Sequence, residues 1–376
     1  MKTVNEIIKN DRCYACGLCG SVCPKNAISV IPDDKSGFYK VRLNADACIS
    51  CGLCYSSCPA ADGAAVSDST VGGHRDIVLC HSTDSEVRHN ASSGGAVNSI
   101  IRYLIESETV DSVLTVRENP DAPFETEIIS ITNDNYALLS ESPRSFASRY
   151  VGVPVLSEFK STGKTAVIGT PCQIKALSKF DRNNEIIKIG IACSAAVSYN
   201  ASRIIKKKLA GEGYRLYYRG NGWPGYNTLT DGNNIIETPH GKSYFEKMYT
   251  SRIFNRYACR FCPSHFAEES DLSFFDFWNS EEIKNEKAGN SACIIRSERG
   301  EAVFSDAKKN GYIETVKAIS EAEAVKTQGV PLKYKSRRPY SGIYFKLADI
   351  IFKTRLYRLI PLKCYKYFCR MLARLG

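Results

Sequence analysis

Apolar positions divide the chain beyond residue 75 into alternating helices and strands. Apolar residues recur at helical spacing in 96–107, directly after a Ser-Ser-Gly-Gly run, and strand-like runs follow at 110–116 and 126–132. A strand, turn and helix unit covers 165–169 and 173–180, and 186–193 has the pattern of another buried strand. These elements predict a mixed α/β domain with a partly parallel sheet flanked by helices.

The first sixty residues follow a different pattern, which is an internal repeat. The sequence DRCYACGLCGSVCP at 11–24 recurs as DACISCGLCYSSCP at 46–59, with every cysteine displaced by 35 residues. The residues that follow, 60–76, are small, polar and Gly-rich, so they contribute little apolar surface to a core. We therefore expect a domain boundary there.

Cysteine content decides how the repeat is interpreted. The chain has 16 cysteines in 376 residues, and its first residues, MKTVNEIIKN, contain no apolar stretch that could act as a signal peptide. We expect a reducing, cytoplasmic setting, in which thiols serve as metal ligands or catalysts rather than in disulfides. No run of about 18 apolar residues occurs, so no membrane-spanning helix is expected.

Each copy of the repeat has the spacing CxxCxxCxxxCP, which is typical of a pair of 4Fe-4S clusters. In proteins with this duplicated spacing the fourth cysteine of each run ligates the other cluster. Zinc also uses CxxC pairs, but it needs two pairs rather than two identical runs of four. One cluster is therefore assigned to Cys13, Cys16, Cys19 and Cys58, and the second to Cys48, Cys51, Cys54 and Cys23.

Four further cysteines form a candidate third site. Cys259 and Cys262 form an isolated CxxC, while Cys172 follows one predicted strand and Cys193 ends the next. Together they would supply an all-thiolate ligand set for a third cluster. Spacing alone leaves zinc binding and simple burial open for these four. The isolated cysteines are interpreted as packing residues: Cys80, Cys293, Cys364 and Cys369.

A protein that joins clusters to a larger domain usually couples single electrons to a two-electron cofactor such as a flavin. Two segments are candidates to hold one. The first precedes a predicted helix, whose unpaired N–H groups favour an anionic or electron-rich group; it consists of Ser92, Ser93, Gly94 and Gly95. The second is a similar strand-to-helix turn with Thr170 and Pro171. Ser and Gly are also ordinary capping residues, and the absence of GxGxxG after a strand argues against a Rossmann fold.

Seven short segments give the chain a family resemblance. They are ASSGGAVNSI (91–100), SRYVGVPVL (148–156), GTPCQIKAL (169–177), YRGNGWPGY (218–226), CRFCPSHF (259–266), SDLSFFDFW (270–278) and GNSACIIRSERG (289–300). In this order they resemble the coenzyme F420 hydrogenase/dehydrogenase beta-subunit family, in which a fused dicluster ferredoxin is common. The resemblance implies an FAD-binding α/β domain with a 4Fe-4S cluster beside the flavin. It also implies electron transfer between a hydride carrier, or reduced ferredoxin in some members, and iron-sulfur centres.

The resemblance also assigns site residues. It places the third cluster on Cys172, Cys193, Cys259 and Cys262. It implies flavin-pocket roles for Ser92, Ser93, Gly94, Gly95, Arg149, Tyr150, Thr170 and Asp276. The chain departs from the family pattern at Ser194 and Ala195, where relatives often have His-Gly, at Glu269 in place of an arginine, and at Phe275 in place of a glycine. A phenylalanine there would fill space that another molecule occupies in relatives, so the hydride donor does not carry over.

Histidine and tryptophan residues add little to this assignment. The five histidines show no pairing with carboxylates at metal or general-base spacing and are interpreted as surface or structural residues: His74, His81, His89, His240 and His265. Trp223 and Trp278 are interpreted as core aromatics.

Charge is concentrated at the end of the chain. The formal net charge is +10, and residues 331–376 hold 12 Lys/Arg but one acidic residue, Asp349, so this part alone carries +11. A stripe of cations lies beside apolar positions at Lys363, Lys366, Arg370 and Arg374. This amphipathic pattern predicts that 341–376 contact an anionic membrane surface, or that they dock on the body of the protein or on an acidic partner. Nucleic-acid binding is not expected, because no reading motif accompanies the charge.

These features predict an α+β protein with a 2×4Fe-4S ferredoxin domain at 1–66 and a linker at 67–79. The two parts of an FAD domain follow at 80–160 and 161–320, with the third cluster in the second part, and a basic tail covers 321–376. We expect an iron-sulfur flavoprotein oxidoreductase whose partner is an electron-carrier protein or a hydride-carrying cofactor. Two alternatives stay open: a ferredoxin-dependent reductase of a sugar or lipid intermediate at the membrane, and a non-catalytic relay subunit of a larger complex.

Overall fold

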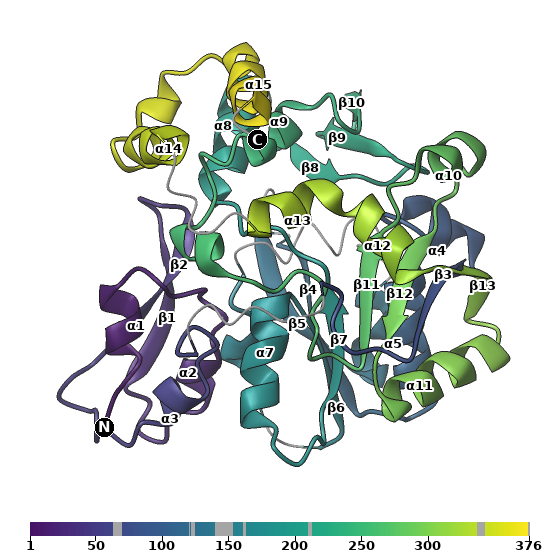
Figure 1. The fold of residues 1–376 in the computed structure, drawn as a ribbon, viewed down its shortest axis with the longest axis horizontal. Helices are drawn as coiled ribbons and strands as arrows, with labels where there is room; N and C mark the ends of the chain where they lie inside the picture. Colours follow the sequence, from purple (N-terminus) through teal and green to yellow (C-terminus); the bar gives the residue numbers. More distant parts are fainter. Residues whose placement is uncertain are drawn as a thin grey trace.

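An eight-stranded sheet forms the centre of the computed structural model, which describes residues 1–62, 70–119, 121, 125–139, 153–160, 163–209, 213–336 and 343–374 (Figure 1). Its strand order is β13-β3-β12-β11-β7-β6-β4-β5. The strands are β3 Asp76–Ser82, β4 Ser112–Glu118, β5 Thr126–Ile131, β6 Thr165–Gly169, β7 Ile187–Ile191, β11 Leu272–Asp276, β12 Ser291–Ile295 and β13 Ile313–Ala318. Two small antiparallel sheets accompany it: β1 Ile28–Asp33 with β2 Phe38–Leu43, and β8 Arg215–Tyr218 with β9 Tyr226–Thr230 and β10 Ile235–Pro239.

The direction of the strands confirms the partly parallel sheet. Neighbours among β4, β6, β7 and β11 are parallel. Strands β11 and β3 both pair antiparallel with β12, so β3 runs in the same direction as β11. The carboxyl ends of these parallel strands therefore meet at one edge of the sheet, where open α/β proteins usually bind ligands.

Helices cover both faces of this sheet. Alternate residues of β3 face different cores, since Val78 and Cys80 pack in one and Ile77 and Leu79 in the other. Helices α5, α7 and α11 contribute to the first core and α12 to the second. The helices between the strands are α4 Ser85–Asn90, α5 Ala96–Glu106, α7 Pro171–Phe180, α8 Tyr199–Leu209, α9 Tyr244–Thr250, α10 Ser280–Asn285 and α11 Glu298–Lys309, and α12 Glu321–Thr327 and α13 Gly329–Ser336 follow the last strand. Short 3-10 helices are η1 Asn133–Leu139, η2 Val155–Glu158 and η3 Tyr257–Phe261.

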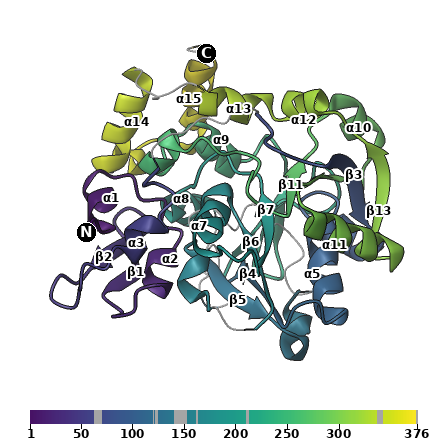
Figure 2. The same cartoon turned by 60° about the horizontal axis from the view of Figure 1, so that its bottom comes forward.

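The N-terminal repeat forms a separate small unit, drawn in purple in Figures 1 and 2. It contains the β1–β2 hairpin and the helices α1 Asn5–Lys9, α2 Leu18–Ser21 and α3 Leu53–Ser56. Its first cysteine loop packs on the body: the Leu156 N–H donates to the Cys16 carbonyl at 3.0 Å, and Ser21 Oγ donates to the Leu156 carbonyl at 2.5 Å. Strand β3 begins at Asp76, so the last residues of the predicted linker already lie in the large sheet.

The basic C-terminal part docks on the body of the protein. It forms α14 Ile343–Lys353, η4 Leu356–Arg358, η5 Leu362–Cys364 and α15 Tyr365–Arg374. Leu362 and Tyr365, two apolar residues of the amphipathic segment 341–376, are buried in a core with Phe254 and Met248. Protein already covers these two apolar side chains, so at these positions the tail docks on the body of the protein, as the second alternative predicted.

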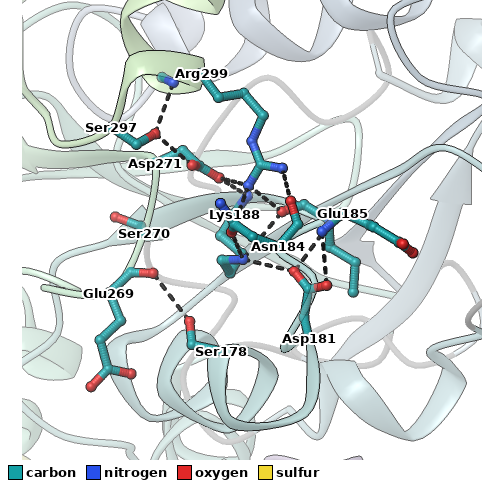
Figure 3. Close-up of polar contacts among 12 residues, drawn as sticks. Ser178, Asp181, Asn184, Glu185, Lys188, Glu269, Ser270, Asp271, Ser297 and Arg299 are labelled. Carbon is teal, nitrogen blue, oxygen red and sulfur yellow. Dashed lines mark hydrogen bonds and ion pairs between the residues drawn. The ribbon is translucent and has the colours of Figure 1, made fainter.

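A buried polar network joins the amino ends of β7 and β11 (Figure 3). Lys188 Nζ donates to Asp181 Oδ2 at 2.8 Å, and both side chains are 5% exposed. Asp271 accepts from the Lys188 N–H at 2.7 Å and from Arg299 at 2.7 Å. The network therefore aligns β7 with β11 and attaches the end of α7 to them, at the opposite end of these strands from the ligand-binding edge.

Candidate functional site

The eight cysteines of the repeat are brought together in two sets. Cys23 lines one small pocket with Cys48, Cys51 and Cys54, and burial raises the pKa of Cys54, which the charges of its three neighbours raise further. In the other set, burial and the charges of Cys19 and Cys58 raise the pKa of Cys16 well above its usual value. Cys13 in turn lies close enough to raise the pKa of both Cys19 and Cys58. This grouping is the one that crossed ligation requires, while ligation itself stays a prediction.

The four scattered cysteines also converge. Cys172, Cys193, Cys259 and Cys262 line one small pocket. Burial raises the pKa of Cys193 to about 12, and the charges of Cys259 and Cys262 act in the same direction. Cys172 lies at the start of α7, Cys193 follows β7, and the CxxC belongs to the segment around η3. Their convergence follows from the side-by-side placement of β6 and β7, which brings two strand ends to one point of the sheet edge.

The sulfur donors of this pocket are four cysteine thiols. Among the described residues, no three His, Cys, Asp or Glu side chains are grouped closely enough to hold one ion. In a 4Fe-4S cluster each thiolate binds a different iron, so four thiols around a shared space suit a cluster. The donor set of four cysteines is that of such a cluster.

The third set lies beside the first. Cys16 is close enough to Cys172 for the two charges to interact. Tyr14 lines the pocket of the third set, and its pKa is raised by burial and by the charges of Cys262 and Cys172, with a smaller effect from Cys58 of the first set. Cys54 of the second set in turn raises the pKa of Cys19 in the first. The three sets therefore follow one another through the protein.

A cavity of about 630 Å³ opens at the carboxyl edge of the sheet. It is lined by the ends of β7 and β11 and by the first turn of α5, whose N-cap is Gly95. The volume is typical of cofactor and ligand pockets. Thr170, Cys193 and Ala195 line this cavity and the pocket of the third cysteine set alike. The cavity and the thiol pocket therefore adjoin, and Cys193 belongs to the walls of both.

Most of the sequence-predicted pocket residues lie at this cavity. Ser92, Ser93, Gly95, Thr170 and Asp276 line it. Gly94 does not line it but packs behind the wall, where a Cβ atom would come within 2.7 Å of the Ser291 nitrogen. Pro171 lines the thiol pocket instead. The remaining two candidates, Arg149 and Tyr150, lie outside the described residues.

Arg219 organises one wall of the cavity, and sequence analysis did not select it. Its guanidinium is ion-paired with Asp276 and donates to the Ser92 carbonyl. It also lies 5.0 Å from the Trp223 ring and 4.9 Å from the Trp278 ring, in cation–π contact. The segment YRGNGWPGY that carried the resemblance contains it, but nothing local indicates that residue 219 reaches residue 276.

Two interpretations of single residues were wrong. His240 is not isolated from carboxylates: its Nδ1 contacts the Glu246 carboxyl group, its ring stacks on Trp278 with ring centres 4.9 Å apart, and it lines the cavity. Trp278 also lines the cavity rather than only a core. His265 also lines the cavity; its Nδ1 contacts the Cys193 carbonyl at 3.1 Å, and burial lowers its pKa to about 4.

The departures from the family pattern fall in different places. Ser194 and Phe275 line the cavity, and Phe275 is buried with its ring edge against Phe266 at 5.1 Å. Arg252 donates to Ser194 Oγ at 3.3 Å. Glu269 lies away from the cavity, beside α7, where its carbonyl accepts from Ser178 at 3.1 Å (Figure 3). Three of the departures, Ser194, Ala195 and Phe275, therefore lie at the cavity, while Glu269 does not line it.

Comparison with known proteins identifies the family of this chain. Residues 77–157 match the N-terminal model of the coenzyme F420 hydrogenase/dehydrogenase beta subunit, and residues 162–321 match its C-terminal model. The chain belongs to this family. Residues 12–61 match a 4Fe-4S dicluster domain, so this family member carries a ferredoxin-like iron-sulfur domain at its N-terminal side.

Several named proteins are similar to this family member. It is 26% identical over 302 residues to the F420-dependent formate dehydrogenase subunit beta of Methanocaldococcus jannaschii, covering 77% of this chain and 74% of the relative. It is 23% identical over 314 residues to an F(420)H(2) dehydrogenase subunit of Methanosarcina mazei, covering 78% and 85%. A chain in the F420-reducing NiFe hydrogenase complex from Methanosarcina barkeri has the same fold, with a TM-score of 0.55, 18% identity, and coverage of 72% of this chain and 93% of that chain. Within the described part of the chain, no helix has the length and apolar character needed to cross a membrane.

Proposed function

We propose that this protein is an FAD-containing electron-transfer oxidoreductase subunit with three 4Fe-4S clusters. One observation carries the proposal: the large cavity and the third cysteine set share Thr170, Cys193 and Ala195 as lining residues. Cys16 of the first set is close to Cys172 of the third. The protein therefore offers a continuous path from an organic partner in the cavity to the ferredoxin-like unit.

The cavity residues fit FAD. Ser92 Oγ is buried beside the cavity, and the described residues provide it with no hydrogen-bond partner. The first turn of α5 also lines the cavity, and the N–H groups of a helix start suit an electron-rich or anionic group. Bound there, FAD would supply the exchange between paired and single electrons. Arg219 would hold the wall in place by joining the Ser92 carbonyl to Asp276.

The cysteine residues fit the clusters. Each set offers four thiols, and bound clusters would carry single electrons. In this proposal Cys58 of the second copy ligates the cluster of the first copy, and Cys23 of the first copy ligates the cluster of the second, so the two clusters join the halves of the repeat. Thr170 Oγ1 lies 3.4 Å from Cys172 Sγ, so this hydroxyl supports the thiol at the boundary between pocket and cavity. The cysteines would thus hold the three clusters, and Thr170 would lie between the third cluster and the cavity.

Partners are proposed at both ends of the path. The names of the relatives make coenzyme F420 a candidate two-electron partner at the cavity. At the other end, Ile49 and Leu53 line the pocket of the second set and are 57% and 47% exposed, as expected of a surface that meets an electron-carrier protein or another subunit. The relatives are named as subunits, which favours such a protein partner.

We also propose that part of the basic tail contacts an anionic membrane surface. Leu347, Ile350 and Leu359 stay exposed, whereas Tyr344, Leu362 and Tyr365 of the tail are buried. The exposed residues lie among or next to the cations of 346–358. Flotation with anionic vesicles should carry the protein upward, and L359E should reduce the floating fraction. Equal flotation of the two proteins would contradict this role.

Cofactor analysis tests the function directly. Protein purified without oxygen should hold one FAD and about 12 iron atoms per chain, four for each cluster. Arg219→Met should lower the flavin content and leave iron unchanged, because it removes the cation that joins Ser92 to Asp276. Arg203→Met is the matched control, since Arg203 pairs with Glu125 and does not line the cavity. Full iron without flavin in the natural protein would refute the flavin and favour a relay subunit.

A further inference from the structure

Two cations lie near the third cysteine set, the buried Lys335 and the half-buried Arg256, and neither belongs to a cysteine motif. Lys335, near the end of α13, lines the pocket together with all four cysteines and is 7% exposed. Its Nζ donates to the Ser264 carbonyl at 2.5 Å. Burying an ammonium group is costly unless nearby negative charge compensates it. Lys335 lies in the part of the chain predicted to be tail, so its position here depends on the tertiary fold.

Arg256 is the second cation, and it lies between the third set and the first. Its guanidinium donates to the Cys13 carbonyl at 3.4 Å and to the Tyr39 carbonyl at 3.0 Å, and it stacks 4.5 Å from the Phe38 ring. Its backbone carbonyl accepts from the Cys259 N–H at 3.1 Å. Arg256 therefore contacts the N-terminal unit and the CxxC of the third set at once.

Charge balance supports a role for Lys335. Lys335 shares one small pocket with all four cysteines, and their thiolates in a bound cluster would supply the negative charge that compensates a buried ammonium group. A cluster held by four thiolates becomes more negative when it accepts an electron, and a nearby buried cation favours this reduced form.

We propose that Lys335 and Arg256 are positioning cations that raise the reduction potential of the third cluster and so bias electrons toward it from the cavity. The inference rests on the proposed third cluster. Lys335 acts on the third cluster alone, whereas Arg256, which touches both sets, acts on the third and the first. A charge-neutral replacement should therefore affect different clusters at the two positions.

Redox titration followed by electron paramagnetic resonance tests the inference on the full-length protein. Lys335→Met keeps most of the side-chain volume and removes the charge, so one of the three cluster potentials should become more negative. Each tenfold weakening of the reduction equilibrium corresponds to a shift of about 59 mV. The potentials of the other two clusters should not change, and Lys335→Arg should restore the potential that shifted in Lys335→Met. Lys317→Met is the control, because it removes a lysine paired with Glu282 that does not line the thiol pocket.

The outcomes separate this inference from the function on which it rests. Three unshifted potentials in Lys335→Met with full iron would overturn the inference. Loss of four irons in both Lys335→Met and Lys335→Gln would also overturn it, since the lysine would then be needed for assembly rather than for potential. A natural protein with about eight irons and two cluster signals would instead refute the third cluster itself.

Discussion

Two equivalent glycines of the repeat offer a test of how the N-terminal unit docks. Gly17 and Gly52 occupy the same place in their copies and have φ of +98° and +81°. Alanine at either position should therefore cost about 1–2 kcal/mol from the left-handed backbone alone. Their surroundings differ, because a Cβ atom at residue 17 would lie 2.4 Å from the Ser157 nitrogen, whereas one at residue 52 would lie 3.3 Å from the flexible Met1 Sδ.

Gly17→Ala should therefore loosen the contact between the repeat and the body, and Gly52→Ala should not. The backbone of 154–157 cannot yield as a side chain can, so overpacking adds about 1–3 kcal/mol at residue 17 only. The Leu156 N–H is protected by its bond to the Cys16 carbonyl. Hydrogen exchange of this N–H should be about 5- to 150-fold faster in Gly17→Ala than in Gly52→Ala. This ratio is the exchange equivalent of the overpacking free energy of about 1–3 kcal/mol.

The assay is anaerobic native-state hydrogen exchange of the segment 153–160, with iron measured on the same samples. Both variants should keep the iron of the N-terminal unit, because neither changes a cysteine. Equal exchange at Leu156 in the two variants would refute the reasoning, since it would mean that the close contact at residue 17 does not hold the unit in place.

Two further predictions concern the third set and the buried network. Cys259→Ala should lower the iron content from about 12 to about eight, whereas Cys293→Ala, at a buried cysteine in the sheet core, should keep it; an unchanged count in Cys259→Ala would show that the ligands are misassigned. Burial alone would raise the pKa of Asp181, but hydrogen bonds from Lys188 and from the N–H groups of Glu185 and Ile186 hold it below its usual value. The Asp181–Lys188 pair therefore stabilises the fold above the unfolded pKa of about 3.9, and this stabilisation is lost as the pH falls through the lower folded value. Lys188→Met should lower the urea stability by about 3–5 kcal/mol at pH 7 and by less in acid, while Lys284→Met at an exposed pair should change it little; a loss independent of pH would contradict the assignment.

The sequence by itself determined the features that depend on local spacing. Each run of the repeat places three thiols two residues apart, so one short loop is enough to indicate a cluster, and the 35-residue displacement shows that the loop is used twice. The strands 165–169 and 187–191 and the helix at 96–106 were also predictable, because each buries a continuous or periodic apolar stretch of its own.

Only the tertiary structure decided which distant residues share a site. The order β11-β7-β6 brings together strand ends that are about a hundred residues apart in the chain, and with them Cys172, Cys193 and Asp276. Arg219 and Lys335 reach the cavity and the thiol pocket from a small separate sheet and from the predicted tail. No local pattern identifies these residues, because long-range packing of the sheet and its helices brings their partners to them. The spacing of a side chain along the sequence does not indicate which distant residue it will contact.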